Sequence, residues 1–441
     1  MSSRLMLRLK LGAMMFFQYA VWGAWTPILG ATVASRLNAS GAEIGAVYGV
    51  LWLACIIAPF IGGQIVDRIM PSQVYLGIAG VVCTFSAYMM STQHSIGTVF
   101  SGGLITWMWV WSLAFAPTIG IANSIAMYHL GKEGTSPEVQ ERDFSLIRTA
   151  GTVGWIAASL VLTYILFHKP PVAKGTWAPY EEMQLAAAFG VILTIVAFLL
   201  PNTPPSKEVK DPWAFTKAFS MFATVPGFLV FMAISFLIST EFQFYYVFSG
   251  PFMEDGMKIP HELISLYKSI AQYAEIICLG VFTPLSLKYL GMRKTLVIGA
   301  LAWPLRYFIF AFYKVLPVPI VLASMSFHGI GFAFVFVTSY IYIDRIAPRD
   351  IRASAQSLFT LVTLGVGNWL GTLFSGWLKD HYTTFVPDPA RAGHMIPGDV
   401  NWQSIFVIPA ITTTVCGIAY LLTFREPKAD SYVEEAVPAK I

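Results

Sequence analysis

The stretch Asn202 to Lys217, which reads NTPPSKEVKDPWAFTK, is the most polar segment in the middle of the chain. Windows of about 20 apolar residues, the length that crosses ~30 Å of hydrocarbon as a helix, recur on both sides of it. Six such windows precede the stretch and six follow it. We therefore interpret it as a linker between two halves of equal span number, which suggests an internal repeat.

Composition agrees with a chain that lies mostly in a membrane. Hydrophobic residues make up 56% of the chain and charged residues 12%, and the mean hydropathy is +0.64. This is too apolar for a soluble domain of the same length, so the sequence predicts an all-α integral membrane protein. Long continuous apolar runs also exclude a membrane barrel, whose strands alternate polar and apolar residues. The predicted spans are residues 11–35, 43–66, 73–91, 97–126, 144–167, 181–201, 226–250, 264–287, 294–313, 317–343, 353–377 and 402–424.

These spans divide the chain into four expected parts: a six-helix bundle over 1–201, a cytoplasmic linker over 202–225, a second six-helix bundle over 226–424 and a cytoplasmic tail over 425–441. Basic residues orient the chain, because cytoplasmic loops carry an excess of Lys and Arg. With a cytoplasmic N-terminus, the outer side collects only Arg36, Lys169, Lys174, Lys258, Lys314, Lys379 and Arg391. We therefore expect both termini in the cytoplasm and a multi-pass protein of the inner membrane. The net charge of +4 is explained by this topology without a nucleic-acid partner.

A local signal occurs twice, six spans apart. Gly63-Gln-Ile-Val-Asp67-Arg68 follows the second span, and Leu287-Lys-Tyr-Leu-Gly291-Met-Arg293-Lys294 follows the eighth. Both resemble the Gly-x-x-x-Asp-Arg-x-Gly-Arg-Lys loop of the major facilitator superfamily, and each copy keeps a different part of it. The resemblance implies twelve helices in two packed halves, with a solute site near the bilayer midplane.

Polar residues inside apolar spans mark candidate functional positions, because they are costly at membrane depth. In the fifth span, Arg148, Thr152 and Trp155 are spaced by four and three residues and share one helical face. They can face a solute, with a guanidinium fork, a hydroxyl and a stacking surface. The alternative is that Arg148 pairs with a carboxylate or reaches the interface.

The seventh span carries Gln243 and Tyr246, three residues apart, so both can meet one ligand. A glutamine amide both donates and accepts hydrogen bonds, which suits hydroxyls or nucleobase edges. The alternative for Gln243 is a hydrogen bond that joins two helices. Glu241 of the same span points to another face.

The eighth span holds Gln272 and Glu275 on one face. A carboxylate at membrane depth costs about 3 kcal/mol on insertion scales, which favours a functional role. We interpret Glu275 as the proton-coupling group; the alternative is a structural pair with Arg148 or Arg306. Lys268 lies nearer the outer end of the span, where we expect it to be solvated.

The tenth span contributes His328 and Phe332. A lone histidine on an apolar face is more often a packing residue than a proton carrier. Phe332 can stack on a planar solute, although most phenylalanines in membranes fill space.

The sequence lacks the motifs of enzymes and ATP-driven pumps. It has no Walker loop, no His-Glu-x-x-His zinc pair and no nucleophile elbow. The four cysteines all fall inside predicted spans and form no metal motif. We therefore expect no enzymatic activity, metal or cofactor, and an ion gradient as the source of energy.

The chain is similar to the nucleoside:proton symporter family of the major facilitator superfamily over nearly its whole length. The resemblance is carried by Gln18-Tyr-Ala-Val-Trp22-Gly-Ala-Trp25, Ile44-Gly-Ala-Val-Tyr48, Arg148-Thr-Ala-Gly-Thr-Val-Gly-Trp155, Gln272-Tyr-Ala-Glu275 and Ile351-Arg-Ala-Ser-Ala-Gln356. It implies an importer of nucleosides with protons. We expect the protein to act as a monomer. The resemblance also implies a solute site formed by Arg148, Thr152, Trp155, Gln243, Gln272, Glu275 and Phe332, to which the spacing in the seventh span adds Tyr246.

Two positions depart from that family. Some members carry an aspartate immediately after the aromatic residue of the tenth span, where this chain has Ala333, and an asparagine at the place of Tyr246. Glu275 is then left as the main candidate for coupling. Two alternatives stay open: a proton-coupled carrier of another polar solute, such as a nucleobase, sugar or glycoside, and a membrane receptor that does not transport.

Overall fold

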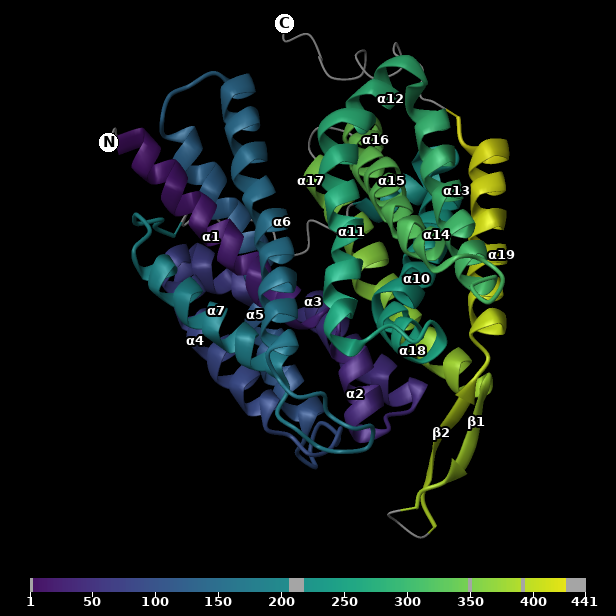
Figure 1. The fold of residues 1–441 in the computed structure, drawn as a ribbon. Helices are drawn as coiled ribbons and strands as arrows, with labels where there is room; N and C mark the ends of the chain where they lie inside the picture. The colour runs from purple at the N-terminus through teal and green to yellow at the C-terminus, as the bar shows by residue number, and fades with distance from the viewer. Residues whose placement is uncertain (1–2, 206–217, 348–350, 390–392, 426–441) are drawn as a thin grey trace, which may run out of the picture.

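The computed structural model describes residues 3–205, 218–347, 351–389 and 393–425 (Figure 1). Most of the predicted linker, residues 206–217, and nearly all of the predicted tail, residues 426–441, lie outside this description. The first six predicted spans correspond to the helices α1 (Ser3–Trp25), α2 (Leu29–Leu37), α3 (Gly41–Arg68), α4 (Ser72–Ser91), α5 (Leu104–Gly131), α6 (Pro137–Phe167) and α7 (Glu181–Phe198).

The later spans contain several short π-helical segments within longer helical rods. Short α9 (Met221–Thr224), preceded by the 3-10 turn η1 (Ala218–Ser220), leads into them. The elements that follow are α10 (Phe228–Pro251), η2 (Phe252–Gly256), η3 (His261–Leu263), α11 (Ile264–Ile277), η4 (Cys278–Phe282), α12 (Thr283–Tyr289), α13 (Gly291–Ala311), α14 (Val318–Ala323), η5 (Ser324–Ser326), α15 (Phe327–Gly331), η6 (Phe332–Val337), α16 (Thr338–Ile346), α17 (Arg352–Thr360), η7 (Leu361–Gly367), α18 (Asn368–His381) and α19 (Trp402–Thr423).

Eleven helical rods in the described residues are long and apolar enough to cross a membrane. The predicted first span is not among these eleven, and the structure divides it into α1 and α2. At the break, the Tyr48 hydroxyl of α3 donates to the Thr26 carbonyl at 2.7 Å and accepts from the Gly30 amide at 3.1 Å. One side chain thus satisfies two backbone groups that the interrupted helix leaves without partners.

The phenol of Tyr48 is therefore expected to contribute to stability. Tyr48→Phe keeps the ring but leaves the Thr26 carbonyl and the Gly30 amide buried without this partner, at a cost of about 1–3 kcal/mol. A lower midpoint of thermal unfolding in detergent is the expected result. Tyr88→Phe, at a position where the side chain is exposed, is the matched control. Equal midpoints for the two variants would contradict the role of the hydroxyl.

The predicted span 97–126 begins too early, since α5 starts at Leu104. Gly97, Gly102 and Gly103 adopt positive φ angles, and Thr98 and Ser101 bond to each other, so this stretch forms a loop. Sequence apolarity alone did not reveal the turn because its residues are short and weakly polar. A second feature outside the predicted helices is the antiparallel hairpin of β1 (Thr383–Pro387) and β2 (Met395–Val400), which joins α18 to α19.

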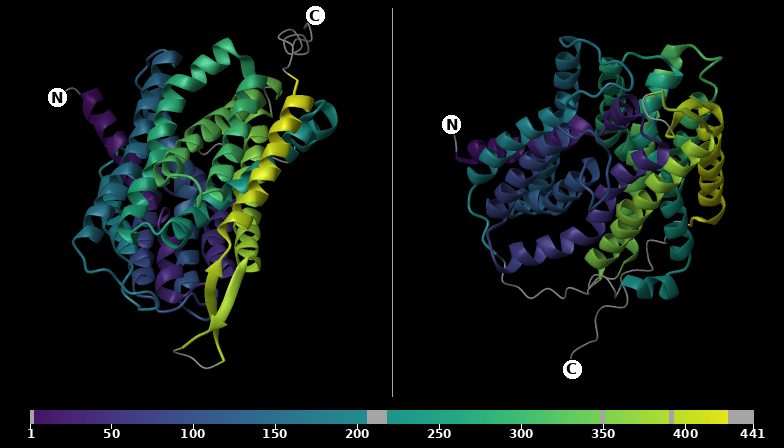
Figure 2. Two further views of the ribbon diagram at one scale, coloured as in Figure 1. Left: turned by 45° about the vertical axis from the view of Figure 1, so that its right-hand side comes forward. Right: turned by 90° about the horizontal axis from the view of Figure 1, so that it is seen from below.

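The helices gather into two groups that lie side by side in Figure 1 and in both views of Figure 2. One contains α1 and α3 to α7, in purple and blue; the other contains α10 to α19, in green and yellow. Short α2 extends below the second group, at the end away from both chain termini. One group is thus formed by the earlier part of the chain and the other by the later part.

Polar contacts join the halves at the end away from the termini. The Asp380 carboxylate of α18 accepts from the amides of Gly41 at 2.5 Å and Ala42 at 2.8 Å, in the first turn of α3. A carboxylate is favourable there because the N-terminal end of a helix carries partial positive charge. Lys174 pairs with Asp255 at 3.7 Å across the same junction.

Glycines let α3 and α18 pack closely next to this contact. Gly41, Gly45 and Gly49 recur every four residues on α3, and a Cβ at Gly45 would lie 3.4 Å from the Cα of Gly376 and closer still to the Thr372 carbonyl. Small residues at this spacing allow helix backbones to approach. The close crossing of α3 and α18 therefore depends on glycine at these positions, because any side chain would push the helices apart.

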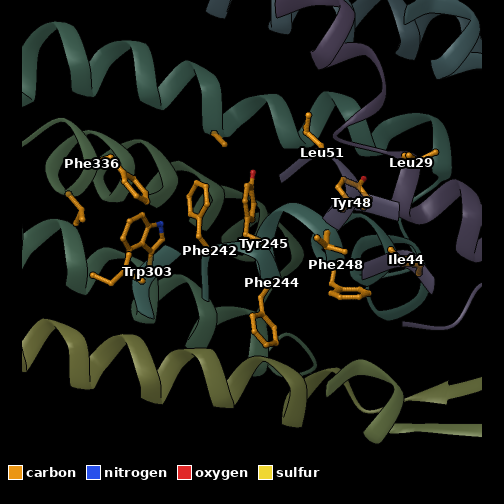
Figure 3. Packing of buried hydrophobic residues seen from close by; sticks show 14 of the residues in the cluster. Leu29, Ile44, Tyr48, Leu51, Phe242, Phe244, Tyr245, Phe248, Trp303 and Phe336 are labelled. Carbon is orange, nitrogen blue, oxygen red and sulfur yellow. The ribbon is translucent and has the colours of Figure 1, made fainter. Parts of the chain in front are cut away.

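The buried core is continuous across this junction. In Figure 3, Phe248 of α10 lies with Leu29, Ile44 and Tyr48 of the N-terminal half, and these four belong to one buried cluster. Further along α10, the rings of Phe242 and Tyr245 are part of the same cluster. The helix α10 thus contributes to the core along its length. Its polar residues therefore lie next to a core formed by side chains of both groups of helices.

Candidate functional site

Glu275 lies on α11, and its carboxylate has one ionic contact among the described residues. Its carboxylate is 3.7 Å from the Nε2 of His328 on α15, and the two side chains are 14% and 0% exposed. Gly329 permits this approach, since a Cβ there would lie 2.6 Å from the Glu275 amide nitrogen. Neither ring nitrogen of His328 has a hydrogen bond to a described residue. The structure thus places a second titratable group beside the predicted coupling residue.

Aromatic side chains enclose His328. Its ring stacks on Phe242 and Tyr245 of α10, with centroids 5.3 and 5.2 Å away, and on Phe332 at 5.9 Å. Tyr246 meets it edge-on at 5.7 Å. Tyr246 and Phe332 are both predicted site residues. In the structure both contact the His328 ring, which lies beside Glu275.

A second cluster lies in the N-terminal half. The guanidinium of Arg148 on α6 lies over the Tyr19 ring of α1, 4.1 Å from its centroid. Trp155, two turns along α6, meets Trp22 of α1 at 5.4 Å with planes at 66°. Gly23 allows this contact, because a Cβ there would approach the Trp155 ring to 2.7 Å. The predicted α6 face is therefore packed against α1, with Trp155 buried and Arg148 half-buried.

Gln243 connects the two halves. Its Oε1 accepts a hydrogen bond of 3.2 Å from the Trp52 indole of α3, while its amide nitrogen is buried without a partner among the described residues. The alternative weighed from the sequence, a hydrogen bond between helices, is therefore present. The unpaired amide nitrogen remains able to donate to another group.

Thr152 and Gln272 form no side-chain hydrogen bond within the described residues. Both belong to the faces that the sequence analysis selected, and α6 packs against α11 across the junction of the halves. The helices that carry the two clusters, α6 and α11, are thus in contact.

The structural pair proposed as the alternative role of Glu275 is not found in the described residues, where its ionic contact is to His328 and not to Arg148 or Arg306. The expectation for Lys268 was wrong. Its side chain is only 4% exposed, and its ammonium donates to the Tyr246 carbonyl at 3.1 Å. Position near a helix end predicted solvation, but the fold buries the lysine and places its ammonium against the backbone of α10.

Sequence reasoning missed Tyr19, Trp22 and Trp52 as neighbours of the site. Apolar and aromatic residues are so frequent in the spans that nothing in their spacing separates them from core positions. Two π-helical segments adjoin the cluster: η4 begins three residues after Glu275, and η6 begins at Phe332. Such segments are frequent at functional sites. They show that both helices depart locally from regular α-helical geometry. The described residues contain no group of His, Cys, Asp and Glu side chains that could hold a metal ion.

The site thus combines a partly buried carboxylate, a neighbouring imidazole, unpaired amides and aromatic faces on spanning helices. The sequence model of the family described as "Nucleoside H+ symporter" matches residues 5–429. The chain belongs to this family. Its fold is that of the major facilitator superfamily, and it is a multi-pass membrane transporter and not an enzyme.

Characterised and named relatives support the same assignment. The putative nucleoside transporter YegT of Escherichia coli K12 is 29% identical over 425 residues, 95% of this chain and 93% of YegT. The nucleoside permease NupG of the same organism is 27% identical over 431 residues, 95% of this chain and 96% of NupG. The xanthosine permease of that organism is 26% identical over 437 residues, 95% of this chain and 96% of the permease.

Solved structures show the same fold. A crystal structure of a mutant of the nucleoside transporter NupG superposes with a TM-score of 0.81 at 26% identity, covering 95% of this chain and all of NupG. A bacterial homologue of the lysosomal transporter Spinster superposes at 0.70 with 15% identity, covering 96% of this chain and 98% of that protein. The second likeness extends the fold comparison beyond nucleoside carriers.

Proposed function

We propose that this family member imports nucleosides together with protons by alternating access, with solute held between α6, α10, α11 and the α15–η6 segment. The observation that carries the proposal is Glu275, a carboxylate on a spanning helix beside His328. The alternation would move the half formed by 1–201 against the half formed by 226–424, with both termini in the cytoplasm. The proton gradient across the inner membrane would supply the energy.

In the proposed binding mode, the planar base lies against Trp155 and Phe332. Arg148, Thr152 and Gln243 offer donors, and Gln272 both donates and accepts. Tyr246 closes the aromatic wall. Glu275 takes a proton from outside, and release of solute and proton inside resets the carrier. We expect this unit to function as a monomer, because every proposed site group comes from one chain.

The direct test is uptake of labelled uridine and adenosine into proteoliposomes under an imposed pH gradient. Accumulation that depends on an acidic exterior supports the proposal. No response to either nucleoside would contradict it. A control assay measures solute exchange with equal pH on both sides of the membrane. A protein that still exchanges solute but does not accumulate it has lost coupling and not binding.

A carrier of a different polar solute is the second candidate function. Ala333 and Tyr246 favour it, because they replace an aspartate and an asparagine at positions where similar chains place hydrogen-bonding side chains. A panel of labelled nucleobases and sugars in the same vesicles distinguishes the two candidates. Proton-driven uptake of a panel member, with no response to nucleosides, would favour the second.

Gln272 provides a test of the binding face itself. Gln272→Ala removes an amide without filling the space, so solute affinity is expected to fall about three- to tenfold, the effect of one hydrogen bond. Competition against labelled uridine in exchange assays measures it. Gln184→Ala, at an exposed position on α7, is the matched control. Unchanged affinity in the Gln272 variant would remove this residue from the site.

A further inference from the structure

The polar face of α11 extends further than the proposed site. Lys268, Gln272 and Glu275 follow one another at steps of four and three residues and so share one face of the helix. Lys268 is buried, and its ammonium has only the Tyr246 carbonyl as a hydrogen-bond partner in the described residues. A cation therefore lies at one end of this face and a carboxylate at the other.

A second cation lies behind the lysine. Arg306 of α13 is completely buried, and none of its three guanidinium nitrogens has a hydrogen bond to a described residue. The guanidinium stacks over the Tyr245 ring at 4.1 Å, and the Lys268 ammonium lies 5.4 Å from the same ring. One tyrosine ring thus lies close to two basic side chains, and a ring offsets only part of the charge of a cation.

No carboxylate of the described residues forms an ion pair with Lys268 or Arg306. Glu275 has its ionic contact with His328, and Glu241 forms no ion pair with Lys268 or Arg306. Buried charges in proteins are normally paired, so an unpaired cluster of this kind is expected to accept an anion.

We propose that Lys268, supported by Arg306, forms an anion-accepting end of the solute site, so that the preferred solute bears a negative charge. This inference rests on the proposed function and names its substrate class: a nucleoside whose base is ionised or carries a carboxylate. The acidic group would lie at the Tyr245–Tyr246 end of the α11 face. Lysine supplies a point charge there, and the guanidinium supplies a second, fixed one.

The test compares matched neutral and acidic nucleosides as competitors of labelled uridine, both in proteoliposome exchange and in binding to the detergent-solubilised protein. Inosine is paired with xanthosine, whose base ionises near neutral pH, and uridine with orotidine, which carries a carboxylate. We expect at least one acidic member to bind about tenfold or more tightly than its neutral partner. Which pair responds distinguishes an ionised ring from a carboxylate. No preference in either pair would overturn the inference.

Variants of Lys268 locate the effect. Lys268→Gln is expected to lower the affinity for the preferred acidic nucleoside about tenfold and to leave that for uridine within about threefold, while Lys268→Arg retains the preference. Lys314→Gln, at an exposed position, is the matched control. Equal weakening of neutral and acidic solutes in Lys268→Gln would contradict the assignment. If this variant fails to fold, the wild-type comparison and Lys268→Arg still decide.

Failure of the proposed function gives a different result. In that case no nucleoside, neutral or acidic, is accumulated in response to the proton gradient. If neutral nucleosides are accumulated and acidic ones are not preferred, only the anion inference fails.

Discussion

Glu275→Gln is expected to abolish accumulation of solute against its concentration gradient. Glutamine keeps the shape of the side chain and one oxygen acceptor but cannot bind and release a proton. Solute should still enter down its gradient and exchange across the membrane, because the other site groups remain. The internal concentration in proteoliposomes under a pH gradient should therefore no longer exceed the external one.

The control for this variant is Glu262→Gln, which removes a carboxylate from η3, outside the proposed site. It should accumulate solute like the wild type. Undiminished uphill uptake in Glu275→Gln would exclude this residue as the coupling group. His328→Phe then becomes the decisive variant, because its ring is the other titratable group at 3.7 Å.

Gly45→Leu is expected to stop transport for a different reason, by preventing the halves from closing at the end away from the termini. Its Cβ would meet the Thr372 carbonyl and lie 3.4 Å from the Gly376 Cα. Overpacking costs about 1–3 kcal/mol, so the closed state should lose about five- to 150-fold in population relative to the open one. Uptake should fall accordingly, while solute binding to the detergent-solubilised protein persists.

Gly120→Leu is the matched control, since a Cβ at this exposed glycine of α5 meets no atom within 4 Å. Its uptake should equal that of the wild type. Wild-type uptake by Gly45→Leu would show that the α3–α18 crossing does not need this close approach. Loss of binding as well as uptake would indicate misfolding instead of a conformational block.

Much of the fold was predictable from local hydropathy. Long apolar runs are sufficient to locate spanning helices, because each must satisfy its backbone groups internally. The same reasoning failed where the chain departs from a regular helix: at the break between α1 and α2, at the loop before Leu104 and at the hairpin of β1 and β2. These features depend on individual turns and on a distant partner such as Tyr48, which hydropathy does not encode.

The candidate site divides in a similar way. Glu275 and Gln272 were identified because polar residues are rare and costly in apolar helices. His328 was interpreted mainly as a packing residue, and the structure adds its contact with Glu275, which Gly329 permits. The roles of all these residues in transport stay predictions that the variants above test.

The sequence by itself determined the membrane class and the identity of the polar positions within the spans. These follow from one-dimensional properties, namely the length, polarity and spacing of residues along each helix. Only the tertiary structure decided which positions meet: Glu275 with His328, Gln243 with Trp52, and buried Lys268 with Tyr245 beside Arg306. The reason is physical, since the close packing of helices far apart in sequence sets these distances, and no single helix contains that information.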